Sequence, residues 1–127
     1  MSPSILPLRF TARVISGRSR GRTLGVPTLN LDLRDVPSDL EDGVFACRAF
    51  IDGKQYPATM HNGPRPTFND TRSCEVHFID QTISPPPTTV DVEVVEFLRG
   101  ISTFPSAEAL SAQMQEDIRN ARDILSA

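Results

Sequence analysis

The chain is poor in the residues that mark several common classes of protein. It has no tryptophan, one tyrosine, two cysteines and two histidines, and its net charge is −3. Barrels that bind single-stranded nucleic acid stack bases on several exposed aromatic side chains and carry an excess of basic charge, so we expect no nucleic-acid partner. Because the histidines and cysteines are few and widely spaced, a zinc site is not expected either.

Long apolar runs are also missing from the sequence. No stretch approaches the roughly 18 apolar residues that a membrane span needs, and residues 1–7 have no basic segment followed by an apolar core. Cys47 and Cys74 lie in apolar, strand-like runs, which favours buried free thiols over a disulfide and fits a reducing compartment. We therefore expect a cytoplasmic protein without a membrane partner. A length of 127 residues predicts one domain, residues 1–127, and we expect a monomer.

Three familiar motifs of nucleotide binding and catalysis are absent. Gly21 and Gly25 stand four residues apart with no Lys-Ser or Lys-Thr pair after them, so residues 17–30 are not the common phosphate-binding loop. No Gly-x-Gly-x-x-Gly fingerprint opens a helix, and no serine lies in a Gly-x-Ser-x-Gly turn. A nucleotide would therefore have to bind through a different architecture.

Residues 17–30, rich in glycine and arginine, are the most informative segment that is present. Glycine lets the backbone approach a ligand closely, and arginine suits phosphate oxygens. Thr28 and Asn30 offer two oxygens on one face of an extended segment, a pair suited to Mg²⁺. The segment predicts a site for a phosphorylated ligand and a metal. The alternative is a surface loop followed by a turn and a strand.

Most of the chain is typical of short strands separated by turns. Strand patterns cover residues 8–15, 29–33, 43–51, 55–60, 73–79 and 88–98, with a hairpin turn at residues 52–53 and a loop at residues 62–66. Helices do not alternate with these strands, which disfavours a parallel α/β fold. The pattern predicts a mainly β fold, a small barrel of six antiparallel strands.

The tail changes to a helical period. One stripe predicts an amphipathic helix from about Ser106, a suitable N-cap, to Leu125, with Met114 packed in the core. The stripe consists of Leu110, Met114, Ile118, Ala121 and Leu125.

Glu75 is the best candidate for a general base. It lies on the polar face of a strand whose other face is apolar, where partial desolvation would raise its basicity. The alternative is a solvated carboxylate on the outside of the barrel. His77 shares its face and could orient a substrate, while His61, placed at a strand end, is a weak candidate. Residues 62–68 form a second rigid segment in which Arg65 could meet a phosphate.

Taken in order, these segments resemble the riboflavin kinase family, whose bacterial members are often the C-terminal half of a bifunctional FAD synthetase. The resemblance rests on residues 17–31, 43–46, 62–68, 75–77 and 97–99, and on Phe104, Ser106, Glu108, Leu110, Gln113 and Asp117. It implies a six-stranded antiparallel Greek-key barrel with a C-terminal α-helix. It also implies transfer of the γ-phosphate of ATP to the 5′-hydroxyl of riboflavin with Mg²⁺, giving FMN and ADP.

The resemblance further implies roles for individual residues. Glu75 would be the catalytic base, Thr28 and Asn30 would hold Mg²⁺, and Arg99 and Phe104 would border the flavin. Nucleotide contacts would come from Gly17, Arg20, Gly21, Arg22, Leu24, Gly25, Pro27, Thr28 and Asn62. No adenylyltransferase domain precedes the segment, so we expect either a kinase alone or a domain once fused to an FMN adenylyltransferase.

The sequence departs from the family pattern at residues 81–87, at Ile101 and at Thr103. We expect these departures to fall on the flavin side of the site and to affect flavin binding and loop closure. They leave open a non-catalytic flavin or nucleotide sensor on the same barrel, although Thr28, Asn30 and Glu75 favour an enzyme. The second alternative, a barrel that binds single-stranded nucleic acid through Arg18, Arg20 and Arg22, conflicts with the scarcity of aromatic residues.

Overall fold

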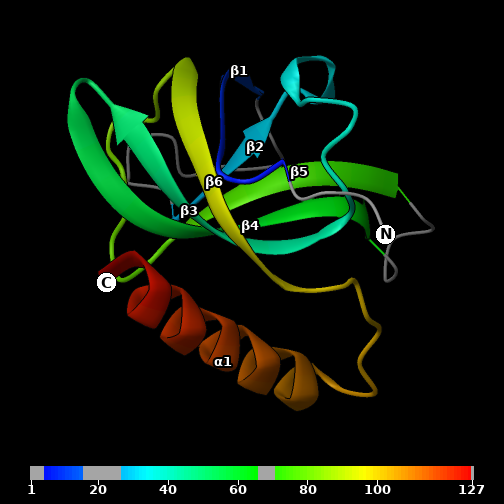
Figure 1. Cartoon of the computed structure of the whole chain (residues 1–127). Coiled ribbons are helices and arrows are strands. Elements are labelled where there is room, and N and C mark those ends of the chain that lie inside the picture. The colour runs from blue at the N-terminus through cyan, green and yellow to red at the C-terminus, as the bar shows by residue number, and fades with distance from the viewer. Residues whose placement is uncertain (1–4, 16–26, 66–70, 127) are drawn as a thin grey trace.

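A closed antiparallel barrel with one helix on its outside forms the fold, in a computed structural model that describes residues 5–15, 27–65 and 71–126 (Figure 1). The strands follow the order β1-β2-β5-β4-β3-β6 around the barrel. The predicted six-stranded barrel with a C-terminal helix is confirmed. The elements are β1 (Leu8–Ile15), β2 (Thr28–Leu31), the short 3-10 helix η1 (Leu33–Asp35), β3 (Gly43–Ile51), β4 (Lys54–Arg65), β5 (Thr71–Phe78), β6 (Thr89–Arg99) and α1 (Ala107–Ser126).

Alternate residues of the strands fill the interior of the barrel. Because successive side chains of a strand point to opposite faces, one face of each strand is apolar and buried. Cys47 and Cys74 belong to this interior as free thiols, and burial raises the pKa of both well above the usual range. The predicted burial of the two cysteines is confirmed. The largest interior side chains are Phe45, Phe78, Leu29, Leu31, Met60, Val76, Val90, Val92 and Val94.

The hairpin between β3 and β4 turns at the predicted residues. Asp52 and Gly53 both have positive φ, 52° and 80°, as a two-residue type I′ turn requires. Ile51 and Lys54 pair across the turn, which fixes the register between β3 and β4. That register decides which β4 side chains reach the outer face beside β5.

The predicted loop at residues 62–66 is wrong for residues 62–65, which continue β4. Asn62 pairs with Cys74, Gly63 with Ser73, and Pro64 with Arg72. Gly63 has φ of 142°, and a Cβ there would lie 3.2 Å from the side chain of Asp42, so the strand needs glycine at this point of close approach. Glycine and proline, which often mark turns, therefore lie here within a strand, at a point where another segment approaches closely. It follows that His61 lies inside β4 and not at a strand end.

The strand predicted over residues 29–33 also ends early. β2 stops at Leu31, and Leu33 begins η1 with 42% of its surface exposed. Asp32 caps η1 by accepting a hydrogen bond from the backbone N–H of Arg34 at 3.0 Å. The Arg34 guanidinium holds the pKa of Asp32 at about 2, and the Arg13 guanidinium holds that of Asp35 well below its usual range. The cap that Asp32 provides therefore starts η1 and ends the strand, although the alternating leucines predicted a strand as far as Leu33.

The C-terminal half of α1 packs on the outside of the barrel, as Figure 1 shows for the end coloured red. Ala121 is fully buried against Ala46 of β3 and Ile79, which follows β5. Arg48 of β3 donates a hydrogen bond to the carbonyl of Leu125 at 3.3 Å and fixes this end of the helix. Ser106 accepts a hydrogen bond from the N–H of Ala109 at 3.1 Å, which confirms the predicted N-cap.

The N-terminal half of α1 stands away from the barrel core. Leu110 and Met114 are 39% and 40% exposed, so the prediction that Met114 packs in the core is wrong. The stripe is continuous in sequence, but only its second half, including Ile118 and Ala121, meets the barrel. The first half faces a cavity. The helices in the described part of the chain lack the apolar length that crossing a bilayer demands.

Candidate functional site

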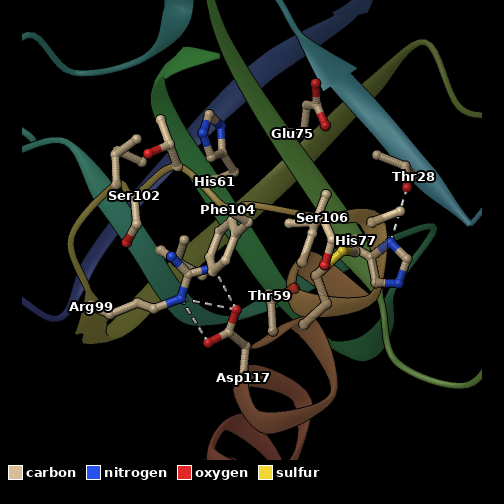
Figure 2. Close-up of a pocket in the computed structure, with 16 residues that line it drawn as sticks. Thr28, Thr59, His61, Glu75, His77, Arg99, Ser102, Phe104, Ser106 and Asp117 are labelled. Carbon is tan, nitrogen blue, oxygen red and sulfur yellow. Dashed lines mark hydrogen bonds and ion pairs between the residues drawn. The ribbon is translucent and has the colours of Figure 1, made fainter. Parts of the chain in front are cut away.

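A cavity of about 580 Å³ lies between the outer face of the barrel and the N-terminal half of α1 (Figure 2). Its barrel wall comes from side chains on the outward face of β2, β3, β4 and β5, and its other wall from α1 and the segment that joins β6 to α1. A concave, partly apolar site of this size suits a small molecule. The barrel wall carries Thr28, Val44, Thr59, His61, Glu75 and His77, and the other wall carries residues 101–104 with Leu110, Met114 and Asp117.

Two rows of cross-strand partners build the barrel wall. Partners in an antiparallel pair place their side chains on the same face, so each row forms a line across the sheet. The first row runs through Asn30, Glu75, His61, Val44 and Arg99. The second runs through Thr28, His77, Thr59 and Ala46. The fold therefore gathers residues from five strands that sequence distance alone would not bring together.

Thr28 and His77 form the polar end of the second row. The Thr28 hydroxyl and His77 Nδ1 lie 3.0 Å apart and share a hydrogen bond whose donor depends on the tautomer of the ring (Figure 2). This bond orients the Thr28 hydroxyl and leaves at least one lone pair of its oxygen for another ligand. The carbonyl of the preceding Pro27 accepts a hydrogen bond from the N–H of Phe78 at 2.8 Å, which ties the start of β2 to β5.

Glu75 lies one row away, on the same outward face. It is half-buried and lines the cavity, while its neighbours Cys74 and Val76 are fully buried in the barrel. Ser73 Oγ donates a hydrogen bond to Glu75 Oε2 at 3.2 Å. Glu75 therefore lies on the polar face of its strand, as predicted, and α1 turns this part of the outer surface into a cavity wall.

Arg99 and Asp117 join the end of β6 to α1. Arg99 Nε lies 2.9 Å from Asp117 Oδ1, and Arg99 Nη2 lies 2.9 Å from Oδ2, a two-pronged pair (Figure 2). Gln113, one helical turn earlier, donates to Asp117 Oδ1 at 3.0 Å. The Asp117 side chain is only 6% exposed, so its charge is compensated by this arrangement.

Phe104 lies close to this ion pair. The Arg99 guanidinium carbon is 5.6 Å from the centre of the Phe104 ring, within range of a cation–π contact. Ile101 and Thr103, two of the departures noted in the sequence, line the same cavity. Both therefore lie at the candidate site, and the expectation that they affect flavin binding stays a prediction. Arg99 and Phe104, both expected at the site, meet there.

Residues 81–87 do not lie at this cavity. Residues 83–87 line a separate hollow of about 640 Å³ together with Phe50, Lys54 and Asp91. The three departures therefore do not gather at one hollow, and the expectation that residues 81–87 affect flavin binding stays a prediction. The β5–β6 connection leaves from the far end of β5, beyond His77 and Phe78, which the sequence alone did not reveal.

The remaining predicted site residues fall into two groups. Asn62 is 3% exposed, outside the cavity lining, and its amide donates to the carbonyl of Glu41 at 3.2 Å. Asn30 is half-buried next to Glu75 in the first row. Both assignments stay predictions. The expected nucleotide contacts Gly17, Arg20, Gly21, Arg22, Leu24 and Gly25 lie outside the described residues.

Sequence reasoning missed the helix side of the cavity. Leu110 and Met114 were expected in the core, and Thr59 and Val44 were not singled out. Thr59 and Val44 could have been found by extending the register of Glu75 and His77 across the sheet. No signal in the stripe separates the half of α1 that packs from the half that lines a cavity.

Comparisons with known proteins agree with the fold and with the family resemblance. The family model described as flavokinase, riboflavin kinase, matches residues 5–125. Two curated relatives, both bifunctional riboflavin kinase/FMN adenylyltransferases, are 32% identical to the chain. One is from Haemophilus influenzae (91% of this chain, 38% of the relative) and one from Escherichia coli K12 (92% and 38%). The chain thus spans well under half of their length.

Two solved structures are similar in fold. A crystal structure described as a macrolide-efflux protein from Streptococcus pneumoniae has a TM-score of 0.73 and 32% identity, covering 91% of this chain and 38% of that one. Riboflavin kinase from Trypanosoma brucei has a TM-score of 0.59 and 18% identity, covering 93% and 79%, and supports the fold alone. Because the family model spans nearly the whole sequence, the chain belongs to the riboflavin kinase family.

Proposed function

We propose that this chain transfers the γ-phosphoryl group of ATP to the 5′-hydroxyl of riboflavin, giving FMN and ADP. The proposal rests on one observation: the same cavity has Thr28 and Glu75 on one wall and Phe104, Leu110 and Met114 on the other. One side offers polar groups for phosphate chemistry and the other an apolar wall. A flavin has the matching division, with a flat ring system at one end and a hydroxylated chain at the other.

The flavin ring packs against the apolar wall of the cavity. Phe104 offers an aromatic face, and Leu110 and Met114 supply exposed apolar surface from α1. Aromatic and thioether groups pack well on flat conjugated rings. With the ring against this wall, the ribityl chain extends toward Glu75 on the barrel side.

Glu75 serves as the base. As the bond from the 5′-oxygen to phosphorus forms, the O–H bond breaks and its proton passes to a Glu75 carboxylate oxygen. The bond between phosphorus and the bridging oxygen breaks, and its electron pair leaves with ADP. Phosphoryl transfer depends mainly on positioning and charge compensation, so the protein needs only one oriented carboxylate to take the proton.

Thr28 and Asn30 are suited to a nucleotide-bound Mg²⁺. Over residues 5–15, 27–65 and 71–126, no three His, Cys, Asp or Glu side chains gather closely enough to hold a metal ion. Mg²⁺ binds well to neutral oxygens together with phosphates and water, and the Thr28 hydroxyl, fixed by His77, has the required chemistry. When bound, Mg²⁺ would neutralise charge on the phosphates of ATP.

Residues 1–127 form, in this proposal, one catalytic domain equivalent to the kinase part of the bifunctional relatives. The described residues that line the cavity lie within one chain, and we propose that the protein is active as a monomer. The two buried free thiols fit the reducing cytoplasm.

The test is an incubation of the purified chain with riboflavin, ATP and Mg²⁺, with flavins and nucleotides separated by chromatography. We expect FMN and ADP in equal amounts, and no FMN when Mg²⁺ is chelated. A folded chain that binds riboflavin and ATP yet forms no FMN would overturn the proposal.

A further inference from the structure

Each titratable group of the cavity lies beside a polar or charged partner. Arg99 and Asp117 compensate each other, and His77 is bonded to Thr28. Glu75 and His61 lie side by side in the first row, as direct cross-strand partners of β5 and β4. The cavity therefore places a carboxylate next to an imidazole at the position where the reaction releases a proton.

The geometry allows these two side chains to exchange a proton. Directly opposed residues of an antiparallel pair have Cβ atoms about 5 Å apart, and both side chains are half-buried and line the cavity. A glutamate and an imidazole at that separation can meet directly or through one water. Figure 2 shows both on the same wall, with His61 on the strand next to that of Glu75.

We propose that His61 takes the proton from Glu75 after phosphoryl transfer and passes it to solvent, restoring the carboxylate for the next turnover. This inference rests on the proposed kinase function. The Glu75 O–H bond breaks, an N–H bond forms on the imidazole, and the resulting cation gives the proton to water. His61 acts through Glu75 and is not itself the base for riboflavin.

Ordinary acidities set the direction of this transfer. An imidazole is ordinarily a stronger base than a carboxylate, so the proton passes from the carboxylic acid to the imidazole. The charged groups around His61 include a carboxylate, Asp42. Asp42 precedes β3, and its pKa is lowered first by Arg72 and to a smaller extent by the charge on His61. The other charged groups of the cavity are His77 beside Glu75 on β5, Arg99 on β6 and Asp117 on α1.

A titration without substrates tests the pairing itself. The chain has two histidines, so two imidazole signals appear in a proton–carbon NMR spectrum, and His61→Gln assigns them by removing one. We expect the His61 signal to titrate at lower pH in Glu75→Gln than in the parent, because the variant loses a neighbouring negative charge. An unchanged midpoint would overturn the pairing, even in a chain that proved to have no kinase activity.

Kinetics of His61→Gln test the transfer. Glutamine fills a similar space and forms hydrogen bonds but takes no proton at neutral pH. We expect kcat to fall by about 10-fold or more, the KM for riboflavin to change by less than about 3-fold, and the pH profile of the rate to lose the ionisation of an imidazole. Lys54→Gln, at the far exposed end of β4, is the matched control and should leave kcat and the pH profile unchanged.

Free imidazole separates proton transfer from packing. It should restore part of the rate of His61→Gly, which has room for it, and none of the rate of His61→Gln. A loss confined to the KM for riboflavin, or an unchanged pH profile in His61→Gln, would make His61 a wall residue and overturn the proposal. Absence of FMN from the parent would instead reject the kinase function.

Discussion

Glu75 owes its place in the cavity to the alternation of a single strand. Its neighbours Cys74 and Val76 are fully buried inside the barrel, so Glu75 must point outward. Such a carboxylate would be an ordinary surface group if α1 did not cover this region. At the scale of one residue, strand parity supplies the direction, and the cavity that α1 closes on its other side makes the carboxylate part of a site.

The substitution Glu75→Gln separates base catalysis from binding. We expect kcat for FMN formation to fall by about 10²- to 10⁴-fold, because the amide takes no proton from the 5′-hydroxyl. Riboflavin and ATP should bind as before, since shape and hydrogen bonding are retained. Rates from chromatography and affinities from flavin fluorescence check this. Glu96→Gln, an exposed carboxylate outside the cavity, is the control, and full activity in Glu75→Gln would remove Glu75 as the base.

The Thr28 hydroxyl is tested by a pair of substitutions. Thr28→Val keeps the shape but loses the oxygen that His77 holds, and we expect the KM for MgATP to rise by about 10- to 100-fold. Thr28→Ser keeps the hydroxyl and should stay within about 3-fold of the parent. Titrating FMN formation with Mg²⁺ at fixed ATP gives the second readout. Equal KM values for the two variants would contradict a role in metal or phosphate binding.

The connection from β6 to α1 is the element that shapes the flavin side. Arg99 ends β6 and Asp117 lies in the middle of α1, so their ion pair sets the distance between barrel and helix. Phe104 lies on the connecting segment and is held near the Arg99 guanidinium. A change in this pair should therefore move the wall on which the flavin ring packs.

Asp117→Asn tests this connection. We expect the free energy of unfolding to fall by about 1–3 kcal/mol, less than for a fully buried pair, because Arg99 keeps 21% exposure and contact with water. The KM for riboflavin should rise while that for ATP stays constant. Urea denaturation and steady-state kinetics measure the two effects, with Asp123→Asn on the exposed side of α1 as the control. Equal changes in both KM values would argue against a specific effect on the flavin wall.

The corner at η1 makes a contribution to stability that depends on pH. The pKa values of Asp32 and Asp35 are lowered by bonds to Arg34 and Arg13. Their contribution is therefore complete above the unfolded pKa of about 3.9 and is lost as pH falls toward the folded value, about 2 for Asp32. We expect Asp35→Asn to weaken the acid dependence of the urea midpoint between about pH 4 and pH 2. An identical slope in parent and variant would show that the corner does not contribute.

The sequence predicts elements well where one local rule applies. Alternation defined residues 43–51, and Asp52-Gly53 defined the hairpin turn, both as observed. Prediction failed where tertiary contact overrides local preference. Gly63 and Pro64 stay in a strand because the neighbouring chain approaches there, and Met114 faces a cavity because only the later turns of α1 reach the barrel. Glu75 was identified from its strand, whereas the opposite wall required the position of α1.

At the scale of the whole molecule, the cavity exists because α1 packs on the barrel by one half only. Ala121 allows the C-terminal half to approach β3 closely, since its methyl group lies fully buried against Ala46 and Ile79. The first half of α1 then stands off, and the space beneath it is the proposed flavin seat. The way in which α1 packs on the barrel therefore also sets the space in which the substrate would bind.

Ala121→Leu tests that coupling. The larger side chain overfills a close-packed contact, which costs about 1–3 kcal/mol of stability, and it forces α1 outward from the barrel. We expect a rise of about tenfold in the KM for riboflavin, equivalent to about 1.4 kcal/mol of binding, with the KM for MgATP unchanged because Thr28 lies on the barrel side. Ala112→Leu, on the exposed face of α1, makes the same chemical change without the contact and should leave both constants as they are. If Ala121→Leu lowers stability but leaves the KM for riboflavin unchanged, the spacing of helix and barrel does not set the flavin seat, and the residues that join β6 to α1 must form it alone.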